Sequence, residues 1–299
     1  MKLYASGFNG WRQLEFKANK ETNEPDDFAS FQLVLSGSSI GRPWSSMSWT
    51  LVRTDAGIQH AGFPDEAIRS SRLEDKLLSS LAARAGNGIV AEYHTTEKTI
   101  HQQPSPFSLT HGSEARVFTG LGVIVQLEAY ETGFVALTED GRVWTWGDER
   151  YAACLGRETH SSPAETPGVV EELEGLPSGK ITRIAAAGYI VLALTEGNDL
   201  YAWGGHPGRR AIVEGLSESP MPIVVEECDI LDCSVGESHV IVLTTNGDAY
   251  LIGDNTNGQL GLPIDKATTW MKLSAIQEEG HPVVAVRAGQ RSSFILTEG

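Results

Sequence analysis

The sequence predicts an all-β fold of the β-propeller class, with six four-stranded blades. Three observations support this prediction. A short strand–turn–strand phrase recurs along the chain, most of its copies follow one another at intervals of 49 to 57 residues, and the two chain ends carry complementary halves of the phrase. Periods of about 20–50 residues are typical of solenoids, propellers and other repeat arrays.

The clearest copy of the phrase occupies residues 134–147. An apolar run, Phe-Val-Ala-Leu, leads through Thr-Glu-Asp-Gly into a second strand that ends in Trp-Thr-Trp-Gly. Two apolar runs joined by a short Asp-Gly turn are a strong local signal for a β-hairpin. Gly141 suits the turn because glycine reaches positive φ without a Cβ clash. Trp144 and Trp146 recur in register with the repeat, so we expect them in the core rather than on a surface that stacks nucleic-acid bases.

Further copies of the phrase occur at residues 194–204 and 243–253, and a shorter one at residues 54–62. The chain ends on residues 294–299, which form the first half of the phrase, and begins on residues 3–7, which form the second half. We therefore expect the two ends to pair and to close a ring. A solenoid would instead cap its terminal repeats with polar faces, and propellers typically have about 4–8 blades.

The spacing of the turn threonines sets the number of blades. Those at positions 138, 195, 244 and 297 are separated by 57, 49 and 53 residues, whereas Thr54 and Thr138 are 84 residues apart. The long interval predicts one degenerate copy, in residues 85–93 with its turn near Thr95, and therefore six blades. The alternative is seven blades, with two short blades between residues 64 and 125.

We expect a single domain over residues 1–299, with the degenerate blade around residues 64–125. Within that section, residues 64–81 have the apolar spacing of a short helix. Residues 31–35, Phe-Gln-Leu-Val-Leu, predict an outer strand. The glycine-rich turns after residues 7 and 253 have matching sequences, so Leu14 and Leu260 are expected at equivalent buried positions.

Composition bounds the classes of partner. The formal net charge of −16 argues against a general nucleic-acid binder, because affinity for phosphates comes mostly from Lys and Arg. The charge is compatible with a basic partner, or with solubility alone. No apolar run reaches the roughly 18 residues of a membrane helix. Three cysteines without a Cys-x-x-Cys motif fit a reducing compartment, so we expect a cytoplasmic or nuclear protein.

The sequence holds no recognised catalytic motif. It has no P-loop, no Gly-x-Ser-x-Gly nucleophile turn and no His-Glu-x-x-His zinc motif. Cys228 and Cys233 could bind a metal, but buried thiols are the favoured interpretation. His239 is expected to be a packed, hydrogen-bonded residue of the repeat rather than a catalytic base. We therefore predict no catalytic residue, no cofactor-binding residue, no metal ligand and no cofactor.

The phrase, followed by Asn-x-x-Gly-Gln-Leu-Gly, resembles the repeat of the regulator of chromosome condensation family. Residues 137–147 and residues 243–261 carry the resemblance, and a blade split between the two chain ends is similar to that family. The resemblance implies a propeller but no particular activity, because function depends on sites rather than folds. The founding member exchanges nucleotide on a small nuclear GTPase and docks on nucleosomes. This chain is acidic and shows no basic tail before its first strand, so an exchange factor or a chromatin-associated regulator is the alternative function.

A second branch of the family is more similar at the start of the chain. Residues 3–14 resemble the opening of short fungal propellers, with Arg12 where the commoner repeat has glycine. Those propellers pair with a small zinc-binding protein of the CSL type and support diphthamide synthesis and Elongator-dependent modification of wobble uridine in tRNA. The resemblance implies a monomeric propeller within a heterocomplex, acting as a non-catalytic adaptor. From the charge and the lack of a long apolar run, we expect no direct binding to nucleic acid or membrane. An enzyme is the third hypothesis.

Six residues are candidates for contact with a partner protein, because they are Trp or Arg in predicted turns outside the repeat. Such residues are enriched at interface hot spots. The alternative for each tryptophan is that it caps the edge of a blade. The candidates are Trp11, Arg12, Trp44, Arg209, Arg210 and Trp270.

Overall fold

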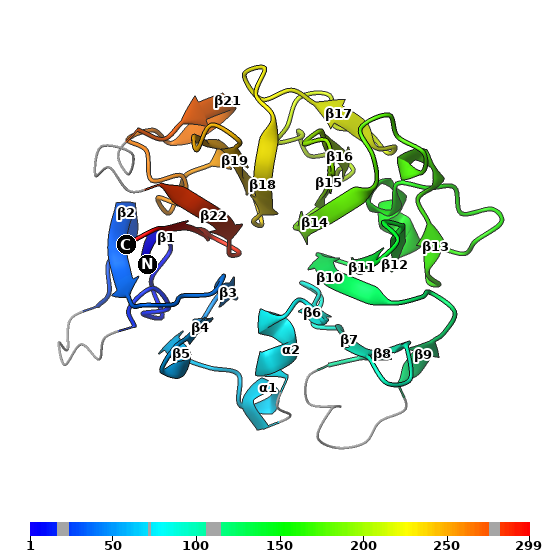
Figure 1. Cartoon of the computed structure of the whole chain (residues 1–299), viewed down its shortest axis with the longest axis horizontal. Helices are drawn as coiled ribbons and strands as arrows, with labels where there is room; N and C mark the ends of the chain where they lie inside the picture. Colours follow the sequence, from blue (N-terminus) through cyan, green and yellow to red (C-terminus); the bar gives the residue numbers. More distant parts are fainter. Residues whose placement is uncertain (17–23, 71–72, 106–114, 275–281) are drawn as a thin grey trace. The chain divides into compact units, whose positions relative to one another are not determined.

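The computed structural model of the chain describes residues 1–16, 24–70, 73–105, 115–274 and 282–299. The described residues form two compact units, which are Met1–Asp65 with Val225–Gly299, and Glu66–Val224. Each unit contains three antiparallel sheets, whose strands are labelled in Figure 1. The expectation of a single domain stays a prediction.

The first unit contains two four-stranded sheets and one three-stranded sheet. The strands of its first sheet are β18 (Ile230–Val235), β19 (His239–Thr244), β20 (Ala249–Asp254) and β21 (Lys266–Lys272). Those of its second sheet are β22 (Val283–Ala288), β23 (Ser292–Thr297), β1 (Lys2–Gly7) and β2 (Phe28–Ser36). Those of its third sheet are β3 (Trp44–Ser45), β4 (Trp49–Thr54) and β5 (Gly57–Gly62).

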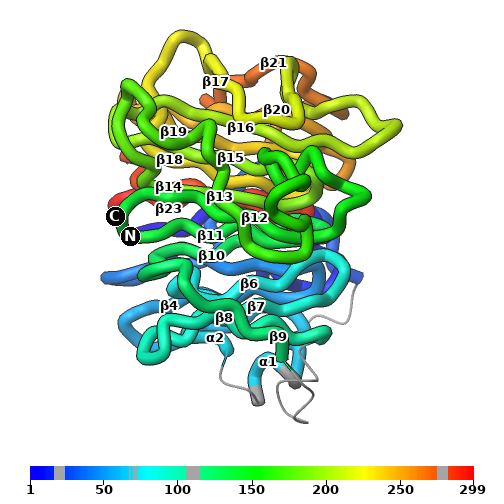
Figure 2. Tube along the Cα trace, turned by 90° about the vertical axis from the view of Figure 1, so that its right-hand side faces the viewer, coloured from blue at the N-terminus to red at the C-terminus, as the bar shows by residue number. Residues whose placement is uncertain are grey.

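The second sheet of this unit is built from both ends of the chain. Strand β1 pairs antiparallel with β23, with Leu3 opposite Leu296, and β2 covers the other side of β1. The two termini lie side by side in both views (Figures 1 and 2). The prediction that the ends complete one hairpin is confirmed, as is the outer strand predicted at residues 31–35.

The second unit contains three four-stranded sheets and four short helical segments among its described residues. The first sheet consists of β6 (Ala82–Arg84), β7 (Val90–His94), β8 (Thr99–Gln103) and β9 (Arg116–Phe118). The second consists of β10 (Ile124–Tyr130), β11 (Gly133–Thr138), β12 (Val143–Gly147) and β13 (Gly168–Val169). The third consists of β14 (Ile181–Ala187), β15 (Ile190–Thr195), β16 (Leu200–Gly204) and β17 (Met221–Ile223). The helical segments are α1 (Glu66–Ser70), α2 (Glu74–Leu78), η1 (Glu149–Leu155) and η2 (Glu171–Leu173).

The degenerate copy predicted in residues 85–93 is the hairpin of β7 and β8, whose turn lies at residues 95–98. It brings the number of sheets in the described residues to six, as predicted, and the alternative of seven blades is wrong. The described part of the β3–β5 sheet has three strands instead of the expected four. After β5 the chain passes Pro64 and enters α1 instead of returning as an outer strand, and proline cannot donate a ladder hydrogen bond.

Neighbouring sheets are joined by side chains on their first strands. In the second unit, Gln126 of β10 forms two hydrogen bonds with the backbone of Ile184 in β14, at 2.6 and 2.9 Å. In the first unit, Asp232 of β18 accepts the N–H of Val286 in β22 at 3.0 Å. Figure 1 shows each pair of strands side by side. The repeat therefore supplies a polar contact between sheets at equivalent positions.

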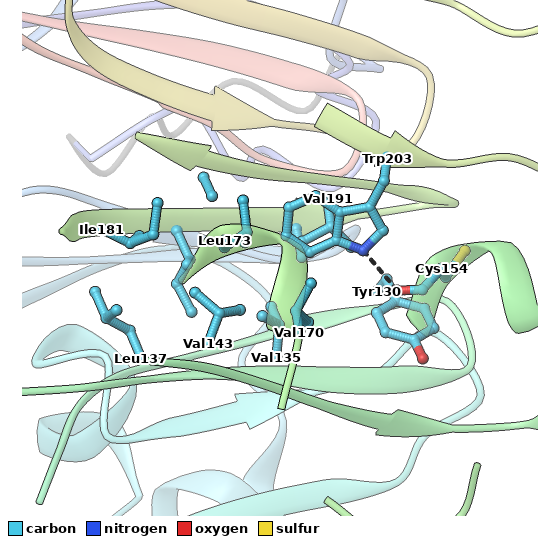
Figure 3. Packing of buried hydrophobic residues seen from close by; sticks show 13 residues of the cluster. Tyr130, Val135, Leu137, Val143, Cys154, Val170, Leu173, Ile181, Val191 and Trp203 are labelled. Atoms are coloured by element: carbon cyan, nitrogen blue, oxygen red, sulfur yellow. Dashed lines mark hydrogen bonds between the residues drawn. The ribbon is translucent and has the colours of Figure 1, made fainter. Parts of the chain in front are cut away.

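The space between sheets is filled by apolar side chains, and Figure 3 shows one such cluster in the second unit. There the Nε1–H of the fully buried Trp203 donates to the carbonyl oxygen of Cys154 at 3.1 Å. Burial raises the pKa of the Cys154 thiol to about 12. Cys233 is also buried, as expected for a packed apolar thiol, whereas Cys228 is only half-buried, and none of the three cysteines forms a disulfide.

Candidate functional site

The loop after β1 is held in a defined shape by its own side chains. Asn9 Oδ1 accepts the N–H of Leu14 at 3.1 Å, and Gln13 Oε1 accepts the N–H of Trp11 at 3.0 Å. Gln13 Nε2 also donates to the carbonyl oxygen of Phe8 at 2.8 Å. Asn9, Gln13 and Leu14 are buried. Because these contacts fix the backbone, Trp11 and Arg12 are presented from a rigid support.

The loop after β20 has the same design. Asn255 Oδ1 accepts the N–H of Leu260 at 2.7 Å, and Gln259 Oε1 accepts the N–H of Asn257 at 2.9 Å. Leu260 is as fully buried as its counterpart in the first loop. The predicted equivalence of Leu14 and Leu260 is therefore confirmed.

The two loops differ at one position. Gly258 has a φ of +81°, and Arg12, at the same place in its loop, has a φ of +58°. A residue with a Cβ in this left-handed region costs about 1–3 kcal/mol. Glycine would avoid that cost, so the arginine is a strained choice for a turn. Its Nη1 forms an ion pair with Glu15 Oε2 at 2.9 Å, and the arginine side chain is 27% exposed.

Beside Arg12, two aromatic rings meet on the surface of the first unit. The rings of Trp11 and Phe63 are edge to face, with centroids 6.0 Å apart and planes at 81°. Trp11 is 48% exposed and Phe63 is 64% exposed. A Cβ on Gly62 would lie 2.9 Å from Gln13 Cα, so the glycine allows the end of β5 to approach the loop that carries Trp11.

Phe63 was not among the candidates predicted from the sequence. Its position directly follows a strand-ending glycine, where aspartates follow Gly147 and Gly253 but Phe8 follows Gly7. An aromatic residue at this position therefore did not distinguish Phe63, and only its contact with Trp11 identifies it.

The structure places the other candidates elsewhere. Trp44 lies in β3 and Trp270 in β21, so the prediction that both lie in turns is wrong. Trp44 pairs opposite Leu51 in the sheet, and its ring packs edge to face on buried Trp49 at 5.6 Å. Trp270 is half-buried on β21, the outer strand of its sheet, where the pairing with β20 is irregular between Ala267 and Met271.

Arg209 and Arg210 are exposed in the loop after β16, in the second unit. The N–H of Arg209 donates to the carbonyl oxygen of His206 at 3.1 Å. His206 in turn packs edge to face on Tyr189, with ring centroids 4.6 Å apart. Trp11 and Arg12 are thus the two candidates that share one loop with each other and one surface with a second exposed aromatic ring.

His239 behaves as the sequence predicted. It is fully buried in the first unit, and its Nε2 lies 2.9 Å from the hydroxyl of Ser293. Burial lowers the pKa of the imidazole to about 4. The ring is therefore neutral at neutral pH and serves packing between β19 and β23.

Two segments match the regulator of chromosome condensation (RCC1) repeat, at residues 140–194 and at residues 232–259. These two segments are similar to that repeat. Among the described residues, no helix is long and apolar enough to cross a membrane, and the expected cytoplasmic or nuclear location stays a prediction.

Relatives with RCC1 repeats match about half of the chain. The mouse regulator of chromosome condensation is 31% identical over 143 residues, which cover 46% of this chain and 32% of that protein. The mitochondrial RCC1 domain-containing protein RUG3 of Arabidopsis thaliana is 31% identical over 173 residues, which cover 54% and 37%. The chain thus spans about a third of the length of these curated relatives.

Solved structures show the fold along the whole chain. Prp20p from Saccharomyces cerevisiae aligns with 99% of this chain and 91% of its own, with a TM-score of 0.65 and 13% identity. Human WBSCR16 aligns with 99% of this chain and 82% of its own, with a TM-score of 0.60 and 16% identity. With six sheets in the described residues, these likenesses confirm the predicted all-β, six-bladed propeller.

Proposed function

We propose that this RCC1-repeat chain is a non-catalytic scaffold that binds another protein through the surface of Trp11, Arg12 and Phe63. The observation that carries the proposal is the exposed aromatic pair on a loop fixed by buried Asn9 and Gln13. Exposed apolar groups next to arginine are typical of interface hot spots. Rigid support lowers the entropy lost when a partner orders the contact.

The partner we propose is a small zinc-binding protein of the CSL type, in diphthamide synthesis and Elongator-dependent tRNA modification. Support comes from the resemblance of residues 3–14 to the branch of propellers that has such a partner. Arg12 supports it further, because a strained arginine where glycine would fit suggests that the side chain is retained for contact. Trp44, Arg209, Arg210 and Trp270 are proposed as further contacts, with less support from their positions.

The first test is affinity purification of the tagged chain from its own organism, followed by mass spectrometry. Recovery of a small CSL-type zinc protein supports the proposed partner. Recovery of other proteins without it contradicts that identity and leaves the docking surface to be tested with whatever binds.

Binding of the recovered partner is then measured with three variants. Trp11→Ala should weaken binding by about 2 kcal/mol, or roughly 30-fold. Arg12→Gly should weaken it as well without lowering the melting temperature, because glycine accepts positive φ. Leu33→Ala is the matched control, since Leu33 is 50% exposed on the neighbouring strand β2. If Trp11→Ala and Leu33→Ala both bind the partner with the wild-type affinity, the partner binds elsewhere.

A second candidate function follows from the likeness to Prp20p, whose structure was reported with its binding to Gsp1p and histones. A chain of this fold could act as an exchange factor for a small GTPase or bind chromatin. The test is the rate of nucleotide release from a purified small GTPase, with and without the chain. Acceleration would favour this function over the adaptor, whereas an unchanged rate together with a CSL-type partner would favour the adaptor.

A further inference from the structure

The hairpin of β7 and β8 gathers histidines on one face. In its register Glu92 lies opposite His101, and His94 lies opposite Thr99. Residues two apart in a strand point to the same side, so Glu92, His94 and His101 share a face. The other face carries Tyr93 and Ile100, which are buried in the core. The hairpin is therefore anchored on one side and presents ionisable groups on the other.

The two imidazole rings are in contact. The centroids of His94 and His101 are 4.0 Å apart, with the ring planes at 21°. Glu97, in the turn of the same hairpin, places its Oε2 3.7 Å from His101 Nε2. The potential ligand atoms of His94, Glu97 and His101 all lie within 4.8 Å of one another.

We propose that His94, His101 and Glu97 form a binding site for a divalent transition-metal ion of the zinc class. Two imidazole nitrogens and one carboxylate are a ligand set of mononuclear zinc sites, in which water takes the fourth position. Tetrahedral ligands at zinc–nitrogen distances of about 2.0–2.1 Å lie roughly 3.3 Å apart. An imidazole binds a metal in the plane of its ring, so the two stacked rings must turn until their nitrogen lone pairs converge on the ion. Glu97 is 64% exposed in a turn, and its carboxylate can rotate to complete the set.

The surroundings of the three ligands are suited to an ion that arrives from solvent. The side chains of His94 and His101 are 34% and 26% exposed. Glu92 Oε1 lies 3.5 Å from His94 Nε2, where it can orient the ring, as outer-shell carboxylates do for metal-bound histidines. The Lys76 ammonium forms an ion pair with the Glu92 carboxylate. We therefore assign Glu92 to the orientation of His94 rather than to coordination of the ion.

The test uses the tag-free chain, stripped with chelator and titrated with Zn²⁺ by calorimetry and with Co²⁺ by visible absorption. One ion per chain and the spectrum of tetrahedral Co²⁺ are expected. His94→Gln and His101→Gln should each weaken Zn²⁺ binding by at least about 10-fold, since even outer-shell changes cost that much. His160→Gln is the matched control, because the His160 side chain is 95% exposed and lies apart from the hairpin in sequence.

Failure of the wild-type chain to bind one Zn²⁺ would overturn the proposal. So would equal affinities for the wild-type chain, His94→Gln and His101→Gln, because the ion would then lie elsewhere. Melting temperatures measured in chelator show whether a variant is folded. If a histidine variant does not fold, Glu97→Gln tests the same site from the exposed turn, and unchanged Zn²⁺ affinity and Co²⁺ absorption in that variant would remove Glu97 from the ligand set and refute the site as stated.

Discussion

The buried His239 predicts a specific dependence of stability on pH. Its imidazole has a pKa of about 4 in the folded chain, lowered by burial, whereas an unfolded histidine titrates near 6.5. Above pH 6.5 the ring is neutral in both states. As the pH falls below 6.5, the unfolded chain takes up a proton that the folded chain refuses until about pH 4. The free energy of unfolding must therefore fall over this window.

The size of the effect follows from the two pKa values. Their difference corresponds to about 3 kcal/mol when the pH is below both. Between pH 7.5 and pH 5, the linkage relation gives a loss of about 2 kcal/mol from this residue. That is a large share of the roughly 5–15 kcal/mol that stabilises an ordinary domain.

Urea denaturation at pH 7.5, 6.5 and 5 measures the effect. The wild-type chain should lose about 2 kcal/mol more than His239→Gln between pH 7.5 and pH 5, because carboxylates titrate in both. His160→Gln is the control for loss of a histidine away from the core, since its side chain is 95% exposed. Equal pH slopes in wild type and His239→Gln would refute the reasoning. If His239→Gln does not fold, nuclear magnetic resonance of the wild-type ring decides, and a titration near 6.5 would refute it too.

Two further predictions concern the first unit. Asp232→Asn should lower the free energy of unfolding by about 2 kcal/mol, because the carboxylate is 2% exposed and forms an ion pair with Arg42 at 2.8 Å. A change below about 0.5 kcal/mol in urea denaturation would contradict this role of the ion pair. Deletion of residues 1–7 removes β1 from between β2 and β23 and should abolish a cooperative melting transition, whereas an unchanged calorimetric melt would show that the paired termini do not support the fold.

The sequence predicted the hairpins well because their signals are local. Gly141 has a φ of +92° and closes the expected turn. Trp146 is buried as expected, whereas Trp144, also expected in the core, is half-buried against the cluster that contains Trp146. The pairing of the chain ends was also predictable, since each end carries half of a phrase that is complete elsewhere. Six blades followed from spacing alone.

The missed features depend on contacts that neighbouring residues do not specify. Trp44 and Trp270 were expected in turns, but Trp44 pairs with Leu51 across the sheet, and β21 continues through Trp270 because Ala267 and Met271 on either side of it pair with β20. Phe63 lies beside Trp11 because Gly62 allows the end of β5 to approach the loop that contains Gln13. His94 and His101 are seven positions apart, and only the register of β7 and β8 stacks their rings.

The sheet shared by the two chain ends has a consequence for synthesis on the ribosome. Strand β1 emerges from the ribosome roughly 285 residues before its partner β23 begins. At about 5–20 residues per second, that interval lasts roughly 15–60 s. During it, one edge of β1 has no strand to pair with, and Leu3 and Ala5, which are fully buried in the finished fold, lack the neighbour that covers them. An unpaired apolar edge is a template for aggregation, so the nascent chain should depend on chaperones until its last strand is made.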